Sequence, residues 1–313
     1  MRYLVTGAAG FIGSHLAEEV RAAGHELRCV DSFNDYYAPQ LKALNAATLD
    51  VERLDLATCD LEPLLDGVDG VYHLAAQAGV RASWGDTFDG YLRNNLQVTQ
   101  RLFGAAAERG VRVVFSSSSS VYGNAATYPT AEDGPTVPVS PYGVTKLACE
   151  GLAAAYRESF GLDVVTLRYF TVYGPRQRPD MGFTRMLAAL AAGSSYGVYG
   201  DGHQARDFTY VSDAVSANVL AMAAAPSGAI YNVGGGSEVE LLDAIAVAET
   251  VAVRSLRIRF EEQAPGDARR TAADTSRIRS ELAWRPTVPL ADGLAAQWEW
   301  YVGSNATGIG AAA

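Results

Sequence analysis

The stretch Gly7-Ala8-Ala9-Gly10-Phe11-Ile12-Gly13 decides the fold that we expect for this chain. The residues just before it, 3–6, have the pattern of a strand, and residues 14–23 after it have the periodicity of a helix. A glycine turn between a strand and a helix is the context that a phosphate-binding loop requires. Gly7 permits the tight turn, Gly10 lets backbone N–H groups approach a pyrophosphate, and Gly13 lets the helix pack closely on the strand.

The alternation of elements after this loop supports the nucleotide interpretation. This support is needed because glycine turns also join strands to helices without binding a ligand. The glycine spacing of three and three also differs from that of the commonest dinucleotide fingerprint. Strand and helix patterns alternate, with strands expected at residues 26–30, 51–55, 70–74 and 112–115 and long helices at 90–108 and 143–160. Such alternation predicts an α/β fold with a doubly wound parallel Rossmann sheet, whose ligand crevice lies at the carboxyl ends of the strands.

The composition excludes several classes of function. A formal net charge of -10 over 313 residues lacks the basic footprint of a nucleic-acid-binding protein, and we find no long apolar run. Cys29, Cys59 and Cys149 are odd in number and far apart, which fits neither a disulfide framework nor a set of zinc ligands. We therefore expect no metal and no nucleic-acid or membrane partner. The chain opens on a strand pattern without a signal peptide, so we expect a cytoplasmic location.

Asp31 ends the second predicted strand, eighteen residues beyond Gly13. A carboxylate there accepts hydrogen bonds from the adenosine ribose hydroxyls and repels a 2′-phosphate, so the sequence favours NAD over NADP; a solvated aspartate is the alternative. Small residues follow the fourth strand, where the cofactor backbone is expected to pass. The residues expected to contact the cofactor in this part of the chain are Gly7, Gly10, Phe11, Ile12, Gly13, Asp31, Asp55, Leu56, Ala75, Ala76 and Gln77.

Two further stretches place polar groups at the same edge of the sheet. Five serines, residues 116–120, lie between Val113-Val114-Phe115 and Val121-Tyr122-Gly123, a setting unlike the flexible linker that is their alternative interpretation. If a helix begins after Ser140-Pro141, Tyr142 and Lys146 lie one turn apart and point the same way. An ammonium about 5 Å from a phenol stabilises the phenolate by roughly 3 kcal/mol at an effective dielectric near 20. Tyrosinate then becomes a usable base, although such a pair is more often a pair of surface neighbours.

Together these motifs resemble the extended short-chain dehydrogenase/reductase family, which includes nucleotide-sugar epimerases and dehydratases. The glycine loop, Asp31, Asn95, the serine run and the Tyr142/Lys146 pair carry the resemblance. Later stretches extend it over nearly the whole chain in the family's order, namely Arg168-Tyr169-Phe170-Thr171-Val172-Tyr173-Gly174-Pro175, Arg178-Pro179-Asp180-Met181, Tyr199-Gly200-Asp201-Gly202, Arg206-Asp207-Phe208-Thr209-Tyr210-Val211 and Pro265-Gly266-Asp267.

The resemblance implies a role for each matching residue near the reaction. Tyr142 would take the proton from the sugar C4 hydroxyl as hydride leaves C4 for the nicotinamide, and Ser118 would hydrogen-bond the same oxygen. Lys146 would bind the nicotinamide ribose and stabilise the tyrosinate. Asn95 would brace this network beside the cofactor.

Ser119 and Ser120 indicate the reaction. Family members that dehydrate or decarboxylate the sugar resemble one another in carrying Glu immediately before Val-Tyr-Gly, and dehydratases carry an Asp before that, because they need an acid or base at C5 or C6. Hydroxyls cannot perform that transfer at neutral pH. Epimerisation needs only oxidation at C4, rotation of the 4-keto sugar and return of hydride to the other face. The resemblance therefore favours a 4-epimerase that regenerates NAD in each turnover.

Thr171 indicates the sugar. Phe-Thr-Val-Tyr-Gly-Pro followed by Arg-Pro-Asp-Met resembles the UDP-glucuronate 4-epimerases, whereas epimerases of neutral UDP-hexoses usually have Asn at this threonine. A C6 carboxylate requires hydroxyl donors and a cation, which Ser117, Ser119, Thr171 and Arg178 would provide. Firm anchoring would also protect the β-keto acid intermediate from losing carbon dioxide. In the alternative interpretation, Thr171 packs under the sheet and Arg178 pairs with Asp180.

The resemblance further implies a division of the chain. Residues 1–174, joined by about 207–236, would form the NAD-binding Rossmann domain, and 304–313 a flexible tail. Residues 175–206 and 237–303 would form a smaller, interleaved C-terminal lobe that binds the UDP-sugar. Arg206 and Arg269 of this lobe would bind the diphosphate, with surface salt bridges as the alternative.

The family also implies a homodimer. The apolar residues Val144, Leu147, Ala148, Leu152, Ala155 and Tyr156, with Leu92, Leu96, Leu102 and Phe103, would form a four-helix interface, although packing against the sheet explains much of the same pattern. Other functions stay open: a 4-epimerase of UDP-glucose or UDP-N-acetylglucosamine, a UDP-glucuronate decarboxylase or sugar-nucleotide dehydratase, and a non-catalytic NAD sensor.

Overall fold

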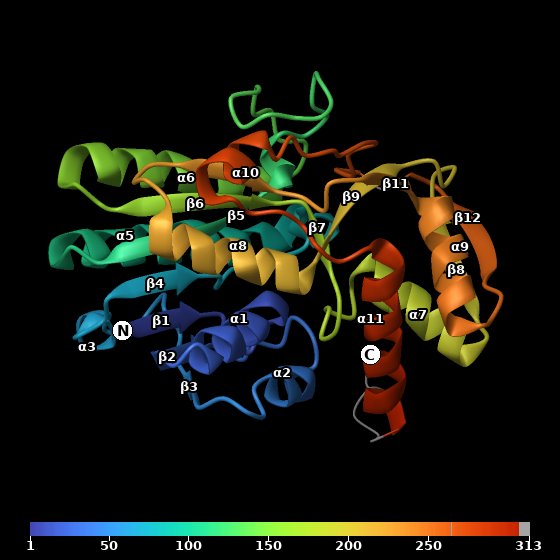
Figure 1. The fold of residues 1–313 in the computed structure, drawn as a ribbon, viewed down its shortest axis with the longest axis horizontal. Coiled ribbons are helices and arrows are strands. Elements are labelled where there is room, and N and C mark those ends of the chain that lie inside the picture. The colour runs from blue at the N-terminus through green and yellow to red at the C-terminus, as the bar shows by residue number, and fades with distance from the viewer. Residues whose placement is uncertain (264, 307–313) are drawn as a thin grey trace.

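A seven-stranded parallel sheet forms the centre of the computed structural model, which describes residues 1–263 and 265–306 (Figure 1). Its strand order is β10-β6-β5-β4-β1-β2-β3, which confirms the doubly wound arrangement expected from the sequence. The bounds are β1 (Arg2–Thr6), β2 (Glu26–Asp31), β3 (Val51–Arg53), β4 (Gly70–His73), β5 (Arg112–Ser118), β6 (Val164–Tyr169) and β10 (Ile230–Val233). Strand β10, which is separated from β6 by about sixty residues, returns to the large sheet beside it.

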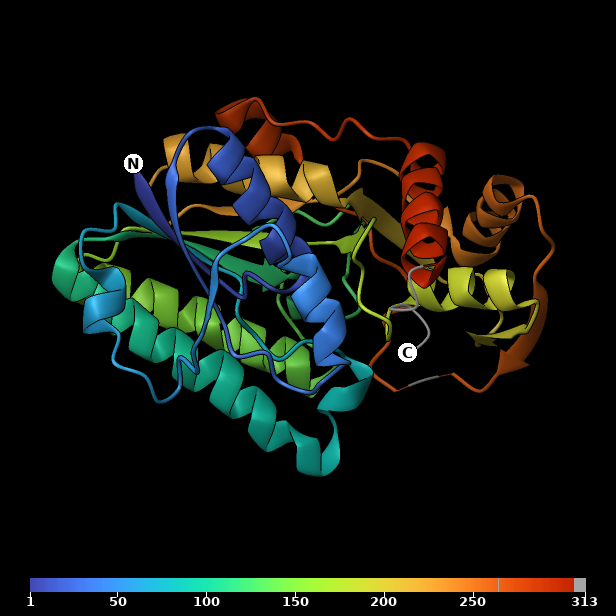
Figure 2. The same cartoon turned by 90° about the horizontal axis from the view of Figure 1, so that it is seen from below.

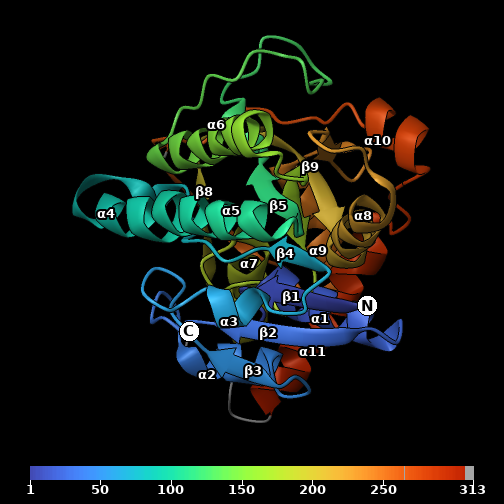
Figure 3. The same cartoon turned by 90° about the vertical axis from the view of Figure 1, so that its left-hand side faces the viewer.

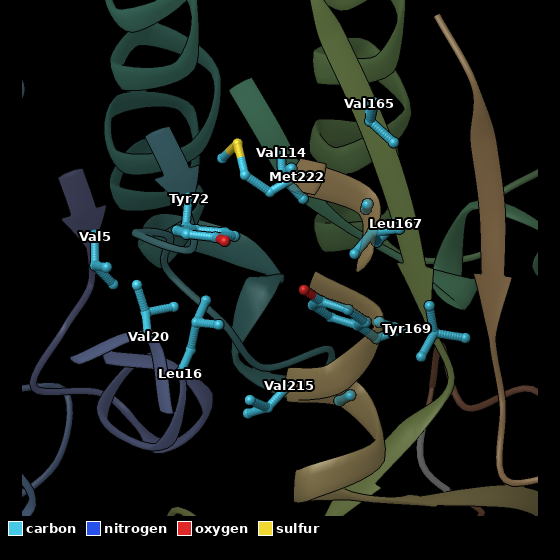
Figure 4. Packing of buried hydrophobic residues seen from close by; sticks show 14 of the residues in the cluster. Val5, Leu16, Val20, Tyr72, Val114, Val165, Leu167, Tyr169, Val215 and Met222 are labelled. Carbon is cyan, nitrogen blue, oxygen red and sulfur yellow. The ribbon is translucent and has the colours of Figure 1, made fainter. Parts of the chain in front are cut away.

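Helices cover both faces of this sheet (Figure 3). One face carries α1 (Phe11–Ala22) and α8 (Val211–Ala224), and the other carries α3 (Glu62–Leu65), α5 (Val98–Arg109) and α6 (Pro141–Phe160). Because both faces are covered, every residue of strand β6 is buried, and buried residues do not alternate with exposed ones along it. Figure 4 shows Leu16 and Val20 of α1 packed with Val215 and Met222 of α8 against side chains of the sheet, namely Val5, Tyr72, Val114, Val165, Leu167 and Tyr169.

The smaller lobe contains two short sheets within the described residues. One pairs β7 (Thr171–Tyr173), β9 (Ala205–Tyr210) and β11 (Glu238–Glu240), and the other pairs β8 (Ser195–Tyr199) with β12 (Arg257–Glu261). Helices α7 (Gly182–Ala192), α9 (Leu241–Ala252) and α11 (Leu290–Ala306) pack around a separate hydrophobic core. Helix α10 (Ser276–Leu282) lies beside α8 (Figure 2) and buries Ile278 and Leu282 in the core of the large sheet, while α2 (Pro39–Asn45) follows β2. Strand β9 is continuous across positions 206 and 207, where the sequence prediction places a domain boundary.

Three predicted elements differ in their bounds. The first three serines of the run belong to β5, because they pair with β6 up to Ser118 and Tyr169. The helix expected at 90–108 is present and runs without a break from Phe88 to Arg109, as α4 (Phe88–Tyr91), a π-helical stretch at Leu92–Gln97, and α5. Residues 304–306 of the expected tail belong to α11 instead, since the helix continues to Ala306 and Ser304 Oγ donates to the Trp300 carbonyl one turn back. The rest of that predicted tail, 307–313, lies outside the described residues.

Two residues of the predicted dimer interface face inward instead. Leu102 and Phe103 are fully buried in the core between α5 and the sheet, so they cannot contact a second chain. The apolar residues of α5 at these two positions pack against the sheet, which is the alternative interpretation given above. Among the helices that the structure describes, none combines the length and apolar character needed to cross a membrane.

Candidate active site

The glycine loop joins β1 to α1 so tightly that neither Gly7 nor Gly13 has room for a side chain. Gly7 has φ of 71°, a left-handed conformation that suits glycine, and a Cβ on it would lie 2.9 Å from the Ala75 nitrogen. A Cβ on Gly13 would lie 2.1 Å from the Gly7 carbonyl oxygen. The bare backbone therefore opens directly onto the N-terminus of α1, the arrangement that binds a pyrophosphate.

Asp31, the last residue of β2, ties two loops beside this turn. Its Oδ2 accepts the Ala9 N–H at 3.1 Å and its Oδ1 accepts the Phe33 N–H at 2.8 Å. The carboxylate is thus fixed in the crevice at the carboxyl end of the sheet, where the ribose of a dinucleotide is expected.

One cavity brings most of the predicted cofactor residues together. Of the residues predicted from the sequence, its walls include Gly7, Gly10, Phe11, Ile12, Gly13, Asp31, Asp55, Leu56, Ala75, Ala76, Gln77, Ser117, Tyr142, Lys146 and Arg178. Residues to which the sequence assigned no role complete it, notably Asn34, Tyr36, Tyr37, Lys42 and Tyr169. Asn95, Ser118, Ser119, Thr171, Arg206 and Arg269 lie outside this lining.

Helix α6 delivers Tyr142 and Lys146 to the cavity. Ser140 caps its N-terminus by accepting the Gly143 N–H at 3.1 Å, and Pro141 occupies the first turn, where its missing N–H costs nothing. Lys146 is buried and donates from Nζ to the Ser116 carbonyl at 2.7 Å. The ring of Tyr142 meets the edge of Tyr91 with centroids 6.2 Å apart. The pair is therefore held inside the crevice and is no exposed surface pair.

Asn95 braces the loop that follows β4. Its Oδ1 accepts the Gln77 N–H at 2.7 Å, and its Nδ2 donates to the Gln77 carbonyl at 3.1 Å and to Thr145 Oγ1 at 3.0 Å. The residue sits in the π-helical stretch, which lets it reach both the loop and α6. It supports the cavity from behind.

His73, which the sequence analysis missed, fixes the start of the same loop. Thr6 Oγ1 accepts the N–H groups of Leu74 and Ala75, so its own hydrogen is donated to His73 Nδ1 at 2.9 Å. The Nε2–H then donates to Thr99 Oγ1 at 3.0 Å. Burial lowers the pKa of His73 to about 3, with Lys146 contributing, so the ring is a neutral spacer.

The serine run points in several directions. Ser117 Oγ donates to Glu150 Oε1, whereas Ser118 Oγ accepts the Ser120 N–H at 3.1 Å and donates to Ser120 Oγ at 3.1 Å. Ser118 thereby caps the 3₁₀ turn of residues 119–121. The Ser117 hydroxyl therefore points into the interior and the Ser118 hydroxyl into the turn, although both were expected to contact one substrate.

Glu150 and Arg168 form a buried ion pair behind these serines. Arg168 donates from Nη2 and Nε to Glu150 at 2.7 and 3.0 Å, and both side chains are 5% exposed. Arg168 Nη1 also donates to Tyr122 Oη at 2.7 Å. Glu150 lies one turn beyond Lys146 on α6, and its partner on β6 could not be read from the sequence.

Arg178 lies on the cavity wall and is paired. Its Nε and Nη2 donate to Asp180 Oδ1 and Oδ2, both at 3.0 Å. Within residues 1–263 and 265–306, its Nη1 makes no hydrogen bond. Thr171 begins β7 and pairs in register with Phe208, outside the cavity lining.

Arg206 and Arg269 line a smaller cavity in the other lobe. Arg206 is tied to the Ala205 and Arg269 carbonyls, and burial lowers its pKa. Arg269 forms an exposed pair with Asp201 at 2.8 Å. Arg81 was not predicted from the sequence. Its guanidinium lies 4.1 Å from the Tyr199 ring centroid and pairs with Asp267. Tyr199 and Asp267 line the smaller cavity.

The model of the family described as "NAD dependent epimerase/dehydratase family" matches residues 3–234. The chain belongs to this family. NAD is the cofactor of the NAD dependent epimerase/dehydratase family, and the cradle formed by Gly7 and Gly13, which a Cβ would fill, fits a dinucleotide. The described residues contain no cluster of acidic, histidine and cysteine side chains that would hold a metal ion.

The chain is also similar to individual proteins along nearly its whole length. A UDP-glucose 4-epimerase of Mycolicibacterium smegmatis is 39% identical over 96% of this chain and 98% of its own. A UDP-glucuronic acid 4-epimerase of Bacillus cereus, solved with UDP-glucuronic acid and NAD, superposes with a TM-score of 0.93 at 40% identity, covering 96% of this chain and 98% of its own. MoeE5, solved with NAD and either UDP-glucuronic acid or UDP-glucose, is 42% identical over 97% of this chain and its whole length, with TM-scores of 0.88 and 0.89.

Proposed function

We propose that this protein is an NAD-dependent UDP-sugar 4-epimerase that converts UDP-glucuronate to UDP-galacturonate. The observation that carries the proposal is a single cavity in which Tyr142, Lys146 and Arg178 share walls with the glycine loop. A dinucleotide seated on that loop would extend toward Tyr142, and a sugar beside Tyr142 would lie within the same enclosure as a guanidinium.

In the proposed mechanism, the Tyr142 phenolate takes the proton of the sugar C4 hydroxyl. NAD held on the glycine loop would supply the hydride acceptor and donor for C4. Lys146, buried and held by the Ser116 carbonyl, supplies the positive charge that stabilises the phenolate. Ser118 would exchange its bond to Ser120 for one to the C4 oxygen. After the 4-keto sugar rotates, Tyr142 would return the proton to the C4 oxygen, and the C4–H bond would re-form on the opposite face of C4.

Arg178 is the group that would select a sugar carboxylate. Asp180 holds two of its nitrogens, which leaves Nη1 for a ligand oxygen. Ser117, Ser119 and Thr171 were predicted to share this role; Ser117 now bonds Glu150, so in our proposal it positions the strand end instead. A carboxylate fixed by Arg178 would be kept out of alignment with the 4-keto group.

Residues around the smaller cavity would contact the UDP. Arg206 and Arg81 supply cations near Tyr199, and an aromatic ring offers a stacking surface to uracil. Arg269, exposed and paired with Asp201, would contribute less.

The test is to incubate the protein with UDP-glucuronate and NAD and to follow the sugar by proton NMR. UDP-galacturonate appearing without a pentose and without net NADH supports the proposal. A 4-keto pentose or UDP-xylose would contradict it in favour of decarboxylation. Arg178→Ala should abolish turnover of UDP-glucuronate, and unchanged turnover would remove Arg178 from the proposal. Full turnover by Tyr142→Phe would remove the catalytic assignment of Tyr142.

A 4-epimerase of neutral UDP-hexoses is the second candidate. It is favoured by the 39% identity to a UDP-glucose 4-epimerase and by the MoeE5 complex with UDP-glucose. The same NMR assay with UDP-glucose decides between them. Conversion of UDP-glucose that is faster than that of UDP-glucuronate, and that is insensitive to Arg178→Ala, would establish the second candidate.

We further propose that the protein works as a cytoplasmic homodimer. Leu92, Val144 and Phe160 are exposed large hydrophobic residues on the π-helical stretch and on α6, on the side away from the sheet. Cys29, Cys59 and Cys149 are free, which suits a reducing compartment.

A further inference from the structure

We propose that residues 175–180, here called the 175–180 strap, close the cofactor cleft and hold NAD in place, with Tyr36 as the latch on its far side. The inference concerns NAD alone and does not depend on which sugar is the substrate. Figure 1 shows this segment descending from β7 toward the blue elements α1 and α2 of the Rossmann sheet.

One end of the strap is bound to α1. His15 Nε2 donates to the Pro175 carbonyl at 3.0 Å, and Arg176 Nη2 donates to Glu18 Oε1 at 3.0 Å. Helix α1 begins at the glycine loop, so this anchor stands beside one wall of the cavity.

The other end is bound to the loop after β2. Tyr36 Oη donates to Asp180 Oδ2 at 3.3 Å, and Tyr36 itself lines the cavity. The same Asp180 carboxylate holds Arg178, which faces the cavity between the two anchors. The strap therefore touches both walls of the cofactor cleft.

The latch is seated on a rigid surface. Gly79 has φ of 106°, and a Cβ there would lie 2.2 Å from Tyr36 Oη, so only glycine admits the phenol. Buried Lys42 holds the same loop by donating to the Asn34 carbonyl at 2.9 Å. A loop fixed at both of these points orders the Tyr36 hydroxyl before the cofactor binds, so closing the strap costs little entropy.

The test measures release of radiolabelled NAD from the holoenzyme during a chase with unlabelled NAD. Tyr36→Phe, which keeps the ring, and Glu18→Gln, which weakens the opposite anchor, should each speed release by roughly threefold to tenfold. Tyr196→Phe is the matched control, because its hydroxyl also makes one long bond, to the Gly182 carbonyl, away from the cavity. Its release rate should equal that of the unmodified protein.

A double variant separates the latch from general loosening. Tyr36→Phe and Asp180→Ala remove the same bond, so the pair should release NAD no faster than Asp180→Ala alone. Melting of the NAD-free protein should be unchanged in Tyr36→Phe. Release at the unmodified rate in both Tyr36→Phe and Glu18→Gln, additive effects in the double variant, or equal acceleration in Tyr196→Phe would each overturn the proposal. These readouts contain no sugar, so they stand or fall separately from the proposed epimerisation.

Discussion

Gly13 leaves the cofactor loop open because it has a hydrogen atom where any other residue has a Cβ that would clash. We predict that Gly13→Ala abolishes NAD binding, because its Cβ would lie 2.1 Å from the Gly7 carbonyl oxygen, which is backbone and cannot turn aside. Equilibrium dialysis with NAD checks this. Gly303→Ala is the control, since a Cβ there meets nothing within 4 Å, and it should bind NAD normally. Normal binding by Gly13→Ala would contradict the assignment of the loop.

Asp207 should make stability depend on pH. Burial raises the pKa of Asp207 to about 6, although three hydrogen bonds from backbone N–H groups lower it in part. Because the folded pKa lies above the unfolded value near 3.9, the native state binds more protons between about pH 4 and pH 6. This contribution to stability is fully present below pH 4 and is lost as pH rises through 6, by about 3 kcal/mol in total.

The measurement for Asp207 is the free energy of unfolding from pH 4 to pH 7. Asp207→Asn does not titrate, so the stability difference between the original protein and the variant should shift against the original as pH rises. Only the slope is compared, because the amide also changes the bonds to Gly235 and Ala273. A pH-independent difference would show that Asp207 keeps an ordinary carboxyl pKa in the fold.

Among the elements, α6 joins the reaction centre to the interior of the sheet. Its first two turns carry Tyr142 and Lys146, and one turn after Lys146, Glu150 is bonded to Ser117 and Arg168. The position of the Tyr142 side chain thus depends on a buried ion pair two turns away. The pair fixes which way the helix faces.

We predict that Glu150→Gln lowers the free energy of unfolding by about 3 kcal/mol or more, because it leaves the Arg168 charge buried and unpaired. Chemical denaturation measures this. Glu158→Gln on the same helix is exposed and should change stability by less than about 0.5 kcal/mol. Equal effects at the two positions would mean that the burial of the pair is unimportant.

At the scale of the molecule, the proposed dimer would use the face of α6 turned away from the sheet. Val144 is 49% exposed and Leu92 39%, so both apolar side chains are available at the surface for contact with a second chain. We predict a dimer by light scattering, and a monomer for Val144→Asp combined with Leu92→Asp. Val137→Asp, at a side chain that is 64% exposed elsewhere, should leave the dimer intact. A monomeric unmodified protein would refute the interface.

The sequence by itself determined the local features of the molecule. The glycine loop, the parallel sheet, and the common face of Tyr142 and Lys146 follow from backbone sterics and from the 3.6-residue period, which act over a few residues. The same reasoning placed the chain in its family. It could not assign the inward side of α5, because an apolar stripe looks the same whether it meets a sheet or a second chain.

Only the tertiary structure decided which distant side chains meet. Arg81 with Asp267, Tyr36 with Asp180, and Glu150 with Arg168 are each joined across the fold. The two short sheets of the smaller lobe arise in the same way, since their strands pair across long intervals. Each contact depends on where the topology brings two loops or strand ends together. No local pattern records that meeting, so the strap over the cofactor cleft became visible only in three dimensions.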